Sequence, residues 1–387
     1  MLSTLFDPTY TAARPQLTAN GNPQSEQALD WQQVIHTISE QLVQADGEEQ
    51  ARLYHRLGYV ALHLGDVRTK ALEAFTLMLE RADRLEHVAL QAMAHVGLSA
   101  VCDTLGQRHD ALAHARQAAK LASSIPDQRL LALALNAEAQ FYKENGQNRR
   151  AHELYQVIGQ IGEELNDRQL CLMSKIGMGR TTSMAQAPVA IQHYEQAMVM
   201  AKLHGDEGAL VVCLNNLADW KINTGCYQEA LEMRQECLQL SRKINSRIGV
   251  GRSLIGMAKA QTLLENFSEA RSLLNKGLPT VMSAGDIEGE LHSSLNLAYL
   301  AAHNDDIPRA CELYRQVLER SLAAPDHACA VFAQLALEQL ASGEIPQPAI
   351  LPRQPLTDAV LNDAKTVDAQ QLALIYPTGD RFWWGSF

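Results

Sequence analysis

The sequence predicts an all-α protein, a right-handed α-solenoid of about seven helix pairs with an N-terminal helix and a C-terminal capping helix. One observation is an internal repeat, because similar segments return about every 40 residues. A second is a polar turn that precedes the repeated alanines, best seen at Gly225 before Ala230. The third is composition: 47% hydrophobic residues but only 5% aromatic residues suit alanine-rich helix packing better than a β-sandwich. The repeated alanines are Ala71, Ala111, Ala151, Ala190, Ala230, Ala270 and Ala310.

Four segments follow from this pattern. Residues 1–23 contain three prolines and are expected to form a flexible N-terminal arm. Residues 24–47 form the N-terminal helix, since Ser25 can cap it and apolar residues recur at helical spacing. Residues 48–343 form the solenoid with its terminal cap. Residues 344–387 form a proline-rich segment and an aromatic C-terminal tail.

Within each repeat we expect one helix, a tight turn, and a second helix that begins near the periodic alanine. The first helix carries a small residue at its middle, because two antiparallel helices approach closely only where side chains are small. Later copies of the turn lose the glycine and have Glu265 or Asp305 there instead. The mid-helix small residues are Gly58, Ser99, Ala139, Ala218, Ala258 and Ala298.

The array is expected to close with a helix from Asp326 to about Leu340, which would cover the last pair. The tail beyond it has four aromatic residues among its last six. Exposed aromatic side chains are costly in water, so we expect the tail to dock on its own array, on a second copy, or on a partner. The residues expected to dock are Phe382, Trp383 and Trp384.

Charge and targeting signals exclude several classes of protein. The net charge of −11, without a dense Lys/Arg run, argues against direct nucleic-acid binding. Residues 1–17 have no basic region followed by an apolar run, so a signal peptide is not expected, and no apolar stretch approaches the ~18 residues of a membrane span. The seven cysteines include no C-x-x-C pair, which favours reduced thiols and a cytoplasmic location.

Motifs for catalysis are missing from the sequence. It contains no phosphate-binding loop, no nucleophile elbow and no zinc-protease motif. Gly177 and Gly179 lack the third glycine and the preceding strand of a dinucleotide loop. His327 and Cys329 are too sparse for a zinc site. We therefore expect no enzyme activity, no cofactor and no metal.

The repeat resembles the tetratricopeptide repeat (TPR), which has a small residue at position 8, glycine at 15, alanine at 20 and an aromatic residue at 24. The resemblance covers roughly residues 48–341. The period of 40 is longer than the usual 34, and the usual tryptophan and proline are mostly missing. This variant is similar to the long-repeat arrays of bacterial regulators, such as the maltose-activator sensor domain and the Rap-type peptide receptors.

The resemblance implies that the first helix of each pair lines a concave groove. Asparagine is a poor mid-helix residue, and its amide can pair with both backbone groups of an extended peptide. The alternative is that these side chains are solvated or bond within the array. The predicted groove residues are Asn136, Gln140, Lys143, Lys175, Asn215, Asn216, Asp219, Asn223, Arg252, Lys259, His292, Asn296, Tyr299 and His303.

Three functions compete. The leading hypothesis is a non-enzymatic scaffold or adaptor that binds a peptide or protein segment in the groove. The alternative is a signal-sensing regulator whose array binds a small molecule or signalling peptide and acts through a partner. The third is a Rap-like phosphatase cofactor, which is disfavoured because residues 24–45 offer one clear helix rather than a three-helix bundle. A homodimer is compatible with all three.

Overall fold

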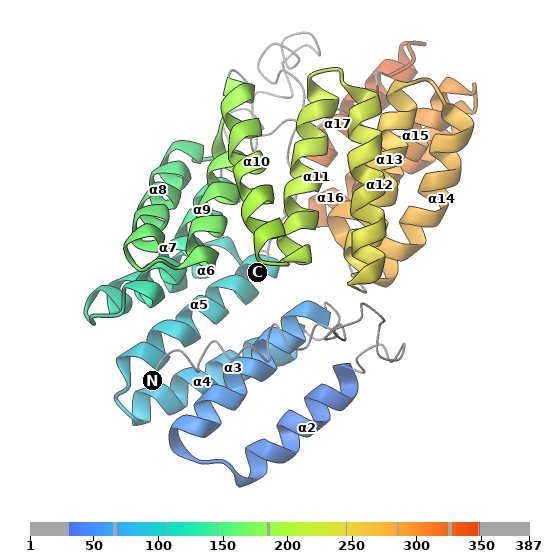
Figure 1. The fold of residues 1–387 in the computed structure, drawn as a ribbon. Coiled ribbons are helices and arrows are strands. Elements are labelled where there is room, and N and C mark those ends of the chain that lie inside the picture. Colours follow the sequence, from blue (N-terminus) through green and yellow to red (C-terminus); the bar gives the residue numbers. More distant parts are fainter. Residues whose placement is uncertain are drawn as a thin grey trace. The chain divides into compact units, whose positions relative to one another are not determined.

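The computed structural model describes residues 31–348, except 65–67, 106, 145, 184–185, 245, 285, 324–326 and 347. These residues form sixteen helices and confirm the all-α prediction (Figure 1). The helices are α2 Trp31–Gln44, α3 Gly47–Leu64, α4 Arg68–Arg84, α5 Val88–Thr104, α6 Arg108–Ser123, α7 Gln128–Glu144, α8 Asn148–Glu164, α9 Arg168–Thr181, α10 Ala187–Leu203, α11 Glu207–Asn223, α12 Tyr227–Lys243, α13 Arg247–Leu263, α14 Phe267–Ser283, α15 Ile287–His303, α16 Ile307–Ala323 and α17 His327–Ala341.

The pairs α3/α4 to α15/α16 are the seven predicted repeats, and α17 is the capping helix. We call the first member of each pair an A helix and the second a B helix. All seven periodic alanines are fully buried. The chain forms two compact units, residues 31–141 with 157–171 and residues 142–156 with 172–348 among those described. None of the described helices has the length and apolar character needed to cross a membrane.

The turns that join A to B helices place one residue in the left-handed region of backbone space. Gly146 and Gly225 take φ values of 72° and 79° there, which glycine adopts without steric cost. Glu265 and Asp305 take the same conformation with φ values of 63° and 60°. The later repeats therefore keep the turn geometry although they have lost the glycine.

The A helices begin at capping residues that also follow the 40-residue spacing. Their side-chain oxygens accept hydrogen bonds from backbone N–H groups of the first turn, which stabilises each helix start. The capping residues are Asp127, Asp167, Asp206, Ser246 and Asp286.

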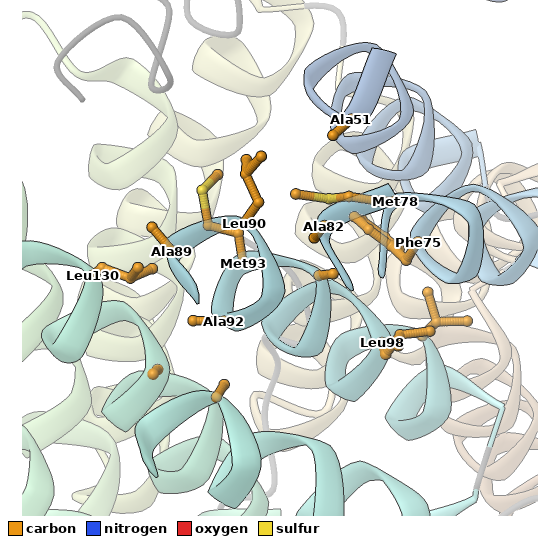
Figure 2. Packing of buried hydrophobic residues seen from close by; sticks show 14 of the residues in the cluster. Ala51, Phe75, Met78, Ala82, Ala89, Leu90, Ala92, Met93, Leu98 and Leu130 are labelled. Carbon is orange, nitrogen blue, oxygen red and sulfur yellow. The ribbon is translucent and has the colours of Figure 1, made fainter. Parts of the chain in front are cut away.

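The core of the first unit forms around Phe75 of α4, which is fully buried (Figure 2). The ring of Tyr59 meets it edge to face, with centroids 5.2 Å apart. Gly97 of α5 lies against the same ring, and a Cβ atom at this glycine would be 2.3 Å from Phe75 Cδ1. The glycine is needed because the aromatic side chain of a B helix inserts against the A helix of the next pair.

Two glycines of α9 in the second unit also face aromatic rings, one from the B helix of the preceding pair and one from the B helix of its own pair. A Cβ atom at Gly177 would lie 2.3 Å from the ring of Tyr155 in α8, the preceding B helix. A Cβ atom at Gly179 would lie 2.8 Å from the ring of Tyr194 in α10. These glycines therefore provide room for two buried tyrosines.

Candidate functional site

The predicted groove residues lie on A helices, but the two units divide them. Asn136 and Gln140 of α7 belong to the first unit, whereas Lys143 and all later members belong to the second. In the second unit α11 contacts α13, α13 contacts α15, and α15 contacts α17. The B helices α12 and α14 pack between successive A helices, and α16 packs between α15 and the capping helix α17. Most of the predicted residues therefore lie on A helices of this unit that contact one another. We call these A helices the A-helix layer.

Three side chains form a buried charged network between α11 and α12. The Arg234 guanidinium of α12 donates hydrogen bonds to Asn215 and to the Asp219 carboxylate, both on α11. The Arg234 and Asp219 side chains are each only 3% exposed. Gly256 of α13 provides the space, since a Cβ atom there would lie 2.4 Å from Arg234 Nε. A buried charge of this kind is tolerated because it is paired and hydrogen-bonded.

Arg234 occupies the repeat position that holds an aromatic residue in four of the other six B helices and Ala115 or Leu274 in the remaining two. Four residues after the periodic alanine come Phe75, Tyr155, Tyr194 and Tyr314, all buried. In the fifth repeat the same place holds Arg234, and Asp219 stands where the fourth repeat has Gly179. The sequence prediction missed Arg234. A charged residue at a repeat position that is apolar or aromatic in all other repeats was the signal that could have identified it.

Asn216 and Asn296 occupy equivalent positions on α11 and α15 and behave alike. Each donates one amide N–H to the backbone carbonyl four residues earlier, at Val212 and His292, over 2.8 Å. Both residues are buried, with 6% and 5% exposure. This bond holds the amide in one orientation and uses only one of its two N–H donors.

Two charged side chains of α13, the A helix between α11 and α15, are largely buried. Arg252 donates from Nε and Nη2 to the two carboxylate oxygens of Asp286, at 2.8 and 2.9 Å. This ion pair links α13 to the capping residue of α15. Lys259, two turns further along α13, is 7% exposed. Its burial places an ammonium group within the A-helix layer.

The C-terminal half of α15 carries an aromatic group. The ring of His303 stacks on Tyr299 with centroids 6.0 Å apart and lies 4.2 Å from the ring centroid of Phe267 in α14. Burial, followed by the charge of Glu265, raises the pKa of Tyr299. On the same face, His292 Nε2 lies 3.9 Å from a carboxylate oxygen of Glu288.

Lys175 of α9 is half-buried beside a pair of histidines. The His152 and His193 rings, from α8 and α10, have centroids 6.4 Å apart. His152 Nδ1 lies 2.9 Å from Thr181 Oγ1. Burial first, then the charges of Lys175 and His152, lower the pKa of His193. The structure therefore places Lys175 in a group of its own at the start of the second unit.

The remaining predicted residues lie at the ends of helices or outside the described part of the chain. Asn223 is half-buried near the end of α11, and His303 is exposed. Phe382, Trp383 and Trp384 lie outside the described residues. Among the residues that the structure does describe, no three His, Cys, Asp or Glu side chains gather closely enough to hold a metal ion. Amides, cations and aromatic rings therefore lie together on the A helices of the second unit.

Comparisons with known proteins agree with this architecture. The family model for the tetratricopeptide repeat matches residues 210–281. A search of curated proteins found no match. Among solved structures, a Rap protein complexed with Competence and Sporulation Factor is similar with a TM-score of 0.57 at 13% identity, covering 81% of this chain and 96% of that one.

Two further structures show the same likeness of fold. The apo form of RapI has a TM-score of 0.53 at 16% identity, covering 69% of this chain and 97% of that one. The Rap conjugation gene regulator of plasmid pLS20, in complex with the Phr* peptide, has a TM-score of 0.51 at 14% identity, covering 81% and 96%.

Proposed function

We propose that this tetratricopeptide repeat protein, whose fold resembles that of the Rap arrays, is a regulator that senses a short peptide and acts through a protein partner. The observation that carries the proposal is the pair of oriented amides, Asn216 and Asn296, on the A-helix layer. The Rap regulator of pLS20 supports it, since that protein is in complex with the Phr* peptide.

The spacing of the two amides suggests the size of the ligand. α11 and α15 are separated by α13, and packed helices lie about 8–10 Å apart, so the amides are roughly 16–20 Å apart. An extended peptide covers about 3.3 Å per residue. A ligand of about five to seven residues would therefore reach both amides. Gly256, at the equivalent position of α13, adds no side chain between them.

The proposal is tested with an immobilised library of random heptapeptides, from which binders to the full chain are selected and their Kd values measured. Replacing Asn216 or Asn296 by leucine should weaken binding about 5- to 10-fold each, because each change removes one amide that pairs with the peptide backbone. Asn275→Leu, on the exposed surface of α14, is the matched control and should leave Kd unchanged. Selected peptides that bind both variants as tightly as the parent would contradict the proposal.

Coupling to a partner is tested by small-angle scattering and by capture from the native host's lysate, each with and without a selected peptide. A regulator should change its radius of gyration and its captured partner when the peptide is added. An adaptor should capture the same partner in both conditions with an unchanged radius. The second result would favour the adaptor function over peptide sensing.

A further inference from the structure

The fourth repeat has cationic side chains at two positions where later repeats pack aliphatic ones. One position lies eight residues after the capping residue of the A helix, and the other lies three residues after the periodic alanine of the B helix. In the fifth repeat they hold Leu214 and Met233, which belong to one hydrophobic cluster. The sixth repeat has leucine at both positions, again within one cluster. In the fourth repeat they hold Lys175 and His193, both half-buried.

A second histidine, His152 of α8, completes this cluster. Its ring lies 6.4 Å from the ring of His193, measured between centroids. The Thr181 hydroxyl donates to the Gly177 carbonyl over 3.0 Å, so its oxygen accepts the 2.9 Å hydrogen bond from His152 Nδ1. This bond fixes the ring, and protonation of His152 turns its Nε2 into a second donor. All of these residues, Lys175 included, belong to the second unit.

The charges of this cluster are not balanced within the described part of the chain. Lys175 and His193 form no ion pair with any described acid, and His193 Nδ1 is enclosed there without a hydrogen-bond partner. Burial first, then the charges of Lys175 and His152, lower the pKa of His193. Burial also lowers the pKa of His152, and Glu153 opposes this effect. Glu153 is exposed and pairs with Arg149 over 3.1 Å.

The second repeat has a histidine pair at the same two positions and satisfies it differently. His95 Nδ1 and His114 Nδ1 lie 2.9 Å apart and share a hydrogen bond. Burial lowers the pKa of both rings, and the charges of Asp83 and Asp110 oppose this effect. That pair therefore has a partner and nearby carboxylates, whereas the cluster of the fourth repeat has donors that face no acid.

We propose that Lys175, His152 and His193 bind an oxyanion, a phosphate or carboxylate group, between α8, α9 and α10. Charge-assisted hydrogen bonds to an oxyanion span about 2.8 Å each, so rings 6.4 Å apart can both donate to one group. Lys175 supplies a permanent positive charge, and the imidazoles take up a proton as the anion binds. This site does not depend on the proposed peptide contacts of Asn216 and Asn296.

The test titrates the full chain with sodium sulfate, which replaces sodium chloride at constant ionic strength. Proton NMR follows the imidazole Hε1 signals, and H152Q and H193M assign the two of interest. Both signals should shift with one saturable Kd. Sulfate stays doubly charged between pH 8 and pH 6, so binding should tighten several-fold over this range because the anion stabilises the imidazolium forms.

Lys175→Leu introduces the residue of the fifth and sixth repeats, so the fold should be kept. It should weaken sulfate binding about 10- to 100-fold, because a charge-assisted hydrogen bond is lost. H193M introduces the methionine of the fifth repeat and gives the same test if K175L does not fold. The matched control is K202L, which removes an exposed lysine of α10 and should leave Kd unchanged.

The absence of a saturable shift in the parent would overturn the proposal. So would equal Kd values in the parent, K175L and H193M, because the shifts would then arise elsewhere. Sodium acetate, titrated in the same way, distinguishes the two sources of the group. Tighter binding of sulfate would support a phosphate ligand, and tighter binding of acetate would support a carboxylate ligand.

Discussion

At the scale of single residues, Arg234 shows that a charged side chain can fill a repeat position that holds an aromatic ring in several other repeats. Its side chain fills the place of an aromatic ring between two A helices, and Gly256 leaves room for it. The cost of burying the guanidinium is offset by Asn215 and Asp219. The network joins the A helix α11, which carries Asn216, to the B helix α12.

Arg234→Ala should destabilise the second unit by about 3–5 kcal/mol, because Asp219 would stay buried without its partner. The double variant D219A/R234L should be less destabilised than R234A, since no buried charge is left unpaired. Urea denaturation followed by circular dichroism measures both. Equal losses in the single and double variants would show that the packing volume of Arg234, rather than its charge, matters.

The histidines predict a loss of stability in acid. Burial lowers the pKa of His55 to about 4. Below its unfolded pKa of about 6.5, the unfolded chain binds a proton that the folded chain does not, so stability falls as pH drops from 6.5 to 4. His55 contributes at most about 3 kcal/mol to this loss. Burial and the neighbouring His114 lower the pKa of His95 to about 4, which adds to the same window.

His55→Gln should flatten part of the acid slope in melting curves recorded between pH 7.5 and 4.5. The parent and the variant should differ most in slope below pH 6.5. His109 lies on the exposed surface of α6, so His109→Gln is a control for the loss of a solvated imidazole. An unchanged slope in His55→Gln would mean that His55 is protonated in the folded chain.

At the scale of elements, arginines tie some A helices to the cap of the next one. Arg252 holds both oxygens of Asp286, which is 3% exposed in its side chain and also caps α15. Arg129 reaches Asp167 over 2.6 Å in the first unit, in a more exposed setting. In each ion pair the carboxylate both caps the start of an A helix and binds an arginine from the preceding A helix.

Arg252→Ala should lower the free energy of unfolding by about 2–4 kcal/mol, because the buried Asp286 carboxylate loses its ion pair with Arg252. Arg129→Ala should lower the free energy of unfolding by about 1 kcal/mol, since its partner Asp167 is more exposed to water than Asp286. Hydrogen exchange at the first turns of α15 and α9 measures the two effects locally. If R129A lost more exchange protection than R252A, burial would not determine how strongly these ion pairs stabilise the helix starts.

The sequence was sufficient to predict the elements because a 40-residue period imposes the same contacts in every repeat. The buried alanines and the small mid-helix residues follow directly from it. The partners of Asn215 could not be predicted, because they depend on which B-helix side chain fills the aromatic position. Asn215, Asn216 and Asn296 bond within the array, which was the alternative to ligand contact. Their contact with a ligand stays a prediction.

At the scale of the whole molecule, stability should be local. In a repeat array each pair contacts mainly its neighbours, so damage to one interface spreads little. Gly97→Ala would place a Cβ atom 2.3 Å from Phe75 and should lower exchange protection in α3–α5. Gly256→Ala would crowd Arg234 and should affect α11–α13 instead. Equal loss of protection throughout the described helices in either variant would show one cooperative molecule.

The regular spacing of the periodic alanines also has a mechanical consequence. If the chain is pulled from its two ends, each repeat that unravels releases about 40 residues. Fully stretched, that segment adds about 130 Å of contour length. The extension trace should therefore show steps of nearly constant size. The contact between α13 and α15, which contains the Arg252–Asp286 ion pair, should break at a higher force than the contacts between other repeats. The repeats should therefore unfold one after another at different forces.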